Sequence, residues 1–84
     1  MQHWKYIMLD MPMSGDTIFI FPPHFSHADM KRAFDHVEVL SAGFVKFDET
    51  EKKFVCYGKS DSLGIGSRPD DAWFASKLLN PFDL

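Results

Sequence analysis

The chain contains very little cysteine: Cys56 is the only one among 84 residues. A single thiol excludes an internal disulfide and any zinc site built from several cysteines. Cys56 stands between the apolar residues Val55 and Tyr57, where a cysteine usually packs as a small hydrophobic residue rather than acting as a nucleophile. We therefore expect a protein of the reducing cytoplasm.

Positive charge is also scarce. Nine Lys and Arg stand against twelve Asp and Glu, giving a formal net charge of -3, and neither sign forms a block along the chain. Nucleic-acid-binding proteins normally carry a basic stripe, so we expect no DNA or RNA partner. No apolar run reaches the roughly 18 residues that span a bilayer, and the N-terminal segment lacks the pattern of a signal peptide. We therefore also expect no membrane partner.

Aromatic residues, in contrast, are abundant, with nine Phe, two Trp and two Tyr. A chain of this length forms one domain with one core, which we take as residues 1–84. A domain this small buries only about 60% of the surface that its unfolded chain exposes. Many rings in so small a domain suggest that some of them meet a partner.

The residue patterns predict an α+β fold with the element order ββαββα and a mainly antiparallel four-stranded sheet. Runs of β-branched and aromatic residues predict strands over 4–11, 17–21, 37–47 and 52–58. The first two and the last two are each expected to form a hairpin. Gly43 inside the third strand indicates either a β-bulge or a close approach by another backbone.

Two short helices complete the expected fold. Ser26 and Asp29 have the spacing of a capping box, which predicts a helix over about 27–36. Ser67 in turn is expected to cap a last helix, which Asn80-Pro81 would stop.

The segment "CYGKSDSLGIGSR", residues 56–68, invites comparison with a phosphate-binding loop. "GKS" resembles the end of a Walker A motif, but that motif needs a glycine where this chain has Lys53. The glycine-rich loop still enters a helix N-terminus, where amide hydrogens can hold an anion. The candidate anion-binding residues are Lys59, Gly64, Gly66, Ser67 and Arg68. The alternative is a purely structural connection, because Asp70 and Asp71 already place negative charge at that helix end.

Metal binding and catalysis receive little support from the sequence. His24 and His27 have the spacing H-x-x-H, but zinc needs three or four converging ligands, and His36 is expected to point roughly half a turn away from His27. No Ser-His-Asp arrangement, pair of catalytic carboxylates or cofactor fingerprint is evident. We therefore expect no metal, no cofactor and no enzymatic activity.

The aromatic residues support the main functional hypothesis. Two short helices are expected to cover only one face of the sheet well, which leaves rings on the other face. That surface would form a homodimer or bind another protein. The candidate interface residues are Trp4, Tyr6, Phe19, Phe21, Phe44 and Phe54. The alternative is that several rings are simply half exposed.

Three short motifs stand out in the second half of the chain: "SAGF" at 41–44, "YGKSDSLG" at 57–64 and "SRPDD" at 67–71. The pattern S-A-G-F, then Y/W-G-x-S-x-S-L-G, then S-R-x-x-D resembles that of small proteins encoded in tailed-phage genomes and bacterial prophages. The matching residues are Ser41, Ala42, Gly43, Phe44, Gly58, Ser60, Ser62, Leu63, Gly64, Ser67, Arg68 and Asp71. The resemblance implies a phage origin and a role in binding a host or phage protein, including inhibition of a host defence.

Overall fold

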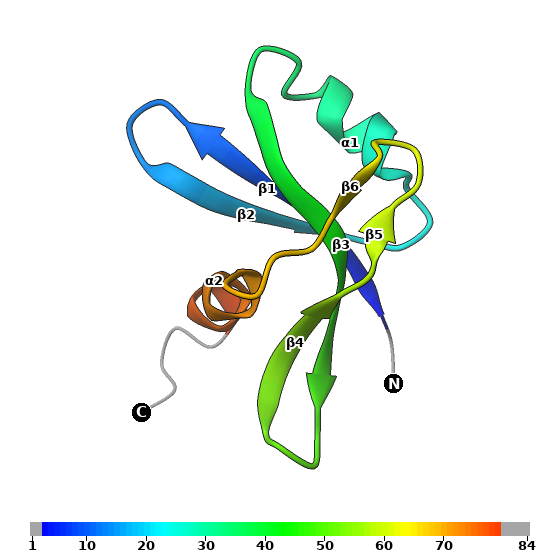
Figure 1. Cartoon of the computed structure of the whole chain (residues 1–84), viewed down its shortest axis with the longest axis vertical. Coiled ribbons are helices and arrows are strands. Elements are labelled where there is room, and N and C mark those ends of the chain that lie inside the picture. Colours follow the sequence, from blue (N-terminus) through cyan, green and yellow to red (C-terminus); the bar gives the residue numbers. More distant parts are fainter. Residues whose placement is uncertain (1–2, 80–84) are drawn as a thin grey trace.

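The structure, a computed structural model, describes residues 3–79. The elements follow the order β1 (Trp4–Met11), β2 (Gly15–Phe21), α1 (His27–Arg32), β3 (Glu38–Asp48), β4 (Lys53–Tyr57), β5 (Lys59–Ser60), β6 (Ile65–Gly66) and α2 (Asp71–Leu79) (Figure 1). The expected α+β class is confirmed, as are the four main strands. The expected helix stop at Asn80-Pro81 lies outside the described residues.

The main sheet is antiparallel, with strand order β2-β1-β3-β4. β3 is the longest strand at 11 residues. It pairs with β1 from Glu38 to Val45 and with β4 from Phe44 to Asp48, so its last three residues extend beyond the pairing with β1. The β3–β4 hairpin therefore projects away from β1 and β2, as Figure 1 shows.

Gly43 lies where a second backbone approaches β3 closely. A Cβ atom at this position would lie 2.5 Å from the carbonyl oxygen of Tyr57, too close for any side chain larger than hydrogen. Of the two expectations for Gly43, close approach is therefore confirmed. The register irregularity between β1 and β3 lies elsewhere, opposite the step from Met8 to Leu9, where Leu40 is the extra residue of β3.

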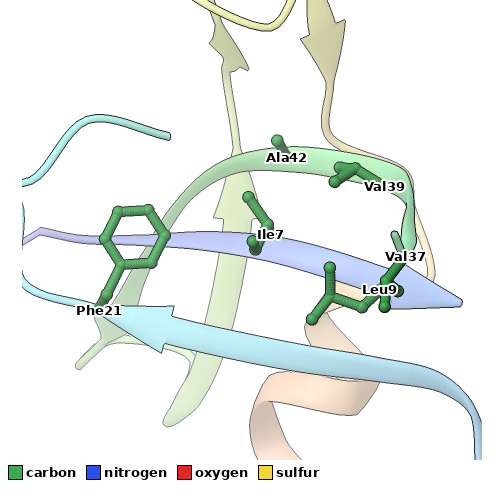
Figure 2. Close-up of a cluster of buried hydrophobic side chains, with 6 residues drawn as sticks. All are labelled: Ile7, Leu9, Phe21, Val37, Val39 and Ala42. Carbon is green, nitrogen blue, oxygen red and sulfur yellow. The ribbon is translucent and has the colours of Figure 1, made fainter. Parts of the chain in front are cut away.

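Each face of the sheet has its own buried cluster. One cluster gathers Ile7, Leu9, Phe21, Val37, Val39 and Ala42 (Figure 2), and Met30 of α1 packs against it. The other contains Tyr6, Met8, Ile18 and Val45 together with Ala75 of α2. The two helices therefore cover opposite faces, and the expectation that together they cover a single face is wrong. β1 is apolar on both of its faces, so each face needs a cover of its own.

Both helices differ in detail from the sequence expectation, α1 at its end and α2 at its start. Ser26 caps α1 as expected, since its Oγ accepts the amide hydrogen of Asp29 at 3.0 Å. α1 nevertheless ends at Arg32, and the chain continues through turns. α2 begins only at Asp71, because a turn closed by the amide of Asp71 and the carbonyl of Arg68 precedes it.

The glycine-rich connection forms a small hairpin that the sequence patterns did not reveal. β5 and β6 pair antiparallel, with Lys59 opposite Gly66 and Ser60 opposite Ile65. Gly64 adopts a φ of 68° in the loop between them, a conformation that glycine accepts without strain. Four residues of the connection, two in each short strand, thus belong to regular structure.

Candidate functional site

Two of the six candidate interface residues are buried in the core. Tyr6 is fully buried beneath α2, and Phe21 is buried on the opposite face, where its ring meets that of His27. β1 is an inner strand of the sheet and Phe21 ends the strand next to it, so both side chains are enclosed by their own subunit. Their assignment to an intermolecular surface is therefore corrected.

Two further candidates, Phe19 and Phe44, are partly buried on the α1 face. Phe19 packs between Phe21 and Phe34, with ring centroids 5.9 and 5.2 Å away. Phe44 contacts His27 edge to face and stacks on Tyr57, each at 5.7 Å. Both rings already have aromatic partners within the chain.

The remaining candidates, Trp4 and Phe54, line an open apolar groove of about 570 Å³ on the α2 side of the sheet. The groove lies between the end of α2 and the β3–β4 hairpin. Its lining is Trp4, Ile20, Val45, Lys46, Phe47, Phe54, Leu78 and Leu79. The sequence predicts an interface role for Trp4 and Phe54 but not for Leu78 and Leu79 of α2.

Within residues 3–79, the groove lies where the last residues of α2 meet the β3–β4 hairpin. Ala75 is fully buried against the sheet, but the projecting hairpin extends past the helix end. There Phe47 and Phe54, directly opposite each other on β3 and β4, form the floor with ring centroids 5.1 Å apart. At the rim, Trp4 remains 40% exposed and Leu78 52% exposed. A solvent-facing apolar surface of this kind favours contact with another molecule.

The five candidate anion-binding residues do not form one site. Arg68 makes ion pairs inside the chain, from Nε to Asp71 at 3.2 Å and from Nη2 to Asp16 at 3.3 Å. Lys59 instead lines a hollow on the other face of the sheet. Because the two cations diverge, the pairing of Lys59 with Arg68 is corrected.

The main-chain groups of that loop are also occupied. The amide of Gly64 donates to the carbonyl of Ser60 at 2.8 Å, and the amide of Ser67 donates to Gly58 at 3.0 Å. Gly66 belongs to the β5–β6 pair. The loop therefore uses these amide hydrogens to hold its own shape, which favours the structural alternative.

A buried polar cluster, unforeseen from the sequence, lies beneath the start of α2. Asp71 is fully buried and accepts hydrogen bonds from the Tyr6 hydroxyl, from the Arg68 amide at 2.8 Å and from Arg68 Nε at 3.2 Å. Burial first, and then the Asp71 carboxylate, raise the pKa of Tyr6 far above its ordinary value, so the hydroxyl keeps its proton. The motif S-R-x-x-D thus places an internal ion pair at this helix end.

Cys56 belongs to the same surroundings. Burial and the negative charge of Asp71 raise the pKa of its thiol to about 12. The thiolate, which is the reactive form, is therefore rare near neutral pH. This agrees with a packing role for Cys56.

The three histidines considered for metal binding have different surroundings. His24 packs on Phe25, His27 is buried, and His36 faces Asp35 on the surface. Within residues 3–79, no three His, Cys, Asp or Glu side chains come close enough to hold a metal ion. In the same part of the chain, no helix is long and apolar enough to cross a membrane.

No known protein family, curated protein or solved structure matches this chain. Its function is therefore inferred from the groove, the buried cluster and the hollow themselves.

Proposed function

We propose that this protein acts without catalysis, by binding another polypeptide in the groove between α2 and the β3–β4 hairpin, and that the occupant is a second copy of the chain. The supporting observation is the groove itself, an apolar concavity of about 570 Å³ that opens to solvent. Covering it removes aromatic and aliphatic surface from water, at roughly 25 cal/mol for each Å².

The shape of this surface suits a symmetric dimer. A twofold interface uses the same patch on both subunits, so the patch must offer both a projection and a recess. Here Trp4 and Leu78 stand half exposed at the rim, and the rings of Phe47 and Phe54 form the recess beside them. Each subunit would place its rim side chains against the other's floor.

The neighbouring sheet edge supports the same arrangement. β4 is an edge strand of the main sheet, and its Phe54 also lines the groove. An edge strand offers unpaired backbone groups to an incoming strand, so hydrogen bonding and apolar contact can act together. The motif resemblance to small phage and prophage proteins supports a role of this kind, in which the dimer contacts a protein of the bacterial host, including a defence protein.

Sedimentation across a range of concentrations tests the proposal. The wild-type chain is expected to dimerise, and Leu78→Glu to weaken the dimer by about tenfold to a hundredfold, because a buried Leu contributes about 1.5–3 kcal/mol. Met13→Glu is the matched control, since Met13 is 97% exposed in the β1–β2 turn, away from the groove. It should leave dimerisation unchanged.

Three results would contradict this assignment. One is a wild-type chain that stays monomeric at every concentration. The second is an equal effect of both variants, which would place the interface elsewhere. The third is dimerisation that appears only when residues 80–84 are deleted, which would make that segment the occupant of the groove in the intact chain.

A further inference from the structure

A polar hollow of about 380 Å³ lies on the face of the sheet opposite the groove. β1 contributes Lys5 and β3 contributes Phe44, whose positions pair directly across the two strands. The start of α1 and the β5–β6 hairpin close the other sides. The complete lining is Lys5, Ser26, His27, Phe44, Lys59, Asp61 and Ser62.

The two lysines carry charge that the described chain does not neutralise. Lys5 donates from Nζ to the carbonyl oxygen of Phe25 at 2.9 Å, which uses one of its three ammonium hydrogens on an uncharged acceptor. The ion pairs found in residues 3–79 involve other cations, so neither Lys5 nor Lys59 has a carboxylate partner there. Two such ammonium groups around one hollow favour the entry of an anion.

Ser26 is occupied by its own helix cap. Its Oγ accepts the amide hydrogen of Asp29 at 3.0 Å, and its hydroxyl bonds to the Asp29 carboxylate. Asp61 adds one negative charge against the two lysines, which leaves the lining net positive in a chain whose formal charge is -3. This net positive lining favours an anionic ligand.

Two rings give the hollow a rigid wall. His27 donates from Nε2 to the carbonyl oxygen of Gly43 at 2.8 Å, and this bond fixes the plane of the imidazole. Phe44 meets that ring edge to face at 5.7 Å. The wall can accept the apolar part of a ligand, and the volume falls within the range of about 300–1,000 Å³ usual for small-molecule sites.

We propose that this hollow binds a small phosphate-bearing molecule, with its phosphate held by the ammonium groups of Lys5 and Lys59, and with its remainder against Phe44. A lysine ammonium group binds phosphate as a mobile point charge and does not require a planar group on the ligand. Arginine, by contrast, typically binds a planar carboxylate through two parallel hydrogen bonds. The site differs from the loop expected from the sequence, since it shares Lys59 with it but excludes Arg68. It is also independent of the groove, which lies across the sheet.

Amide chemical shifts measured during titration with inorganic phosphate test this site. Saturable shifts are expected at Ser26, His27, Lys59 and Ser62, while sodium chloride at the same ionic strength should not reproduce them. Lys59→Gln and Lys5→Gln should each weaken phosphate binding about tenfold or more, because a hydrogen bond to a charged group contributes about 1.5–3 kcal/mol. Lys59 is exposed, so its replacement should leave folding intact.

Lys77→Gln is the matched control. It removes the same charge from α2, where the Lys77 ammonium lies 5.3 Å from the Trp73 ring, outside the hollow. Phosphate affinity should stay at the wild-type value in this variant. An equal loss of phosphate affinity in Lys5→Gln, Lys59→Gln and Lys77→Gln would overturn the proposal. Chemical-shift changes that never saturate with phosphate would also overturn it. Acetate binding as tightly as phosphate would overturn the assignment to phosphate.

Discussion

The hydroxyl of Tyr6 donates a hydrogen bond to the carboxylate of Asp71 across 65 positions of the chain, and both side chains are fully buried. The bond joins β1, an inner strand of the sheet, to the first residue of α2. The same carboxylate also holds the backbone and side chain of Arg68. One buried acid thus fixes both the start of α2 and the turn before it. Since the groove opens at the far end of this helix, its shape depends on that attachment.

Removal of either partner is expected to destabilise the fold by different amounts. Tyr6→Phe should cost about 1.5–3 kcal/mol, the contribution of a hydrogen bond to a charged group. Asp71→Ala should cost more, about 3–5 kcal/mol, because it leaves Arg68 and the Tyr6 hydroxyl without their buried partner. Urea unfolding measures both values. Glu49→Ala, an exposed change in the β3–β4 turn, should stay within about 0.5 kcal/mol of the wild type. A Tyr6→Phe variant as stable as the wild type would show that the bond contributes nothing.

The parts of the fold that the sequence predicted correctly depend on local signals. Alternating β-branched and aromatic residues marked the four long strands, and the spacing of Ser26 and Asp29 marked the start of α1. β5 and β6 escaped prediction because each has only two residues, too few for any periodicity to appear.

The site was less accessible to sequence reasoning, because it depends on contacts between distant residues. Asp71 looked like a residue that complements a helix dipole on the surface, and only the docking of α2 on Tyr6 reveals it as buried. The sequence predicts Trp4 and Phe54 as interface residues because they are aromatic, and both line the groove. Leu78 was not predicted, since helical spacing alone cannot reveal that the last turn of α2 lines a groove.

Gly43→Ala is expected to destabilise the fold by about 1–3 kcal/mol, the usual cost of inserting a methyl group into a filled space. The added Cβ would lie 2.5 Å from the Tyr57 carbonyl oxygen, so β3 or the end of β4 must shift. Gly66→Ala is the matched control, since the nearest atom to its Cβ would be at 3.7 Å, an ordinary contact. That variant should be neutral or slightly stabilised, because alanine restricts the unfolded chain. Equal unfolding midpoints for the two variants would contradict the close approach.

His27 is expected to make stability depend on pH in the weakly acidic range. Burial lowers its pKa below the ordinary 6.5, the positive charge of Lys5 lowers it further, and the hydrogen bond to Gly43 opposes both. The unfolded chain therefore binds more protons than the folded chain between the folded pKa and about 6.5, so stability rises with pH across that interval. The contribution of neutral His27 is fully present above about 6.5 and is lost as the pH falls through the folded value.

Urea unfolding between about pH 5 and pH 8 measures this effect through the difference between the wild type and His27→Gln. Taking this difference cancels the contribution that the carboxylates common to both proteins make to the pH dependence of stability. Phosphate buffers are avoided because His27 also lines the proposed phosphate site. The wild type should lose stability on acidification more steeply than the variant, since glutamine has no proton to gain in this range. Lys5→Gln should make the wild-type slope shallower, because it removes a positive charge that disfavours protonated His27. Parallel pH profiles for the wild type and His27→Gln would mean that His27 takes up its proton equally well in the folded and unfolded chain, and the account of its burial would then be wrong.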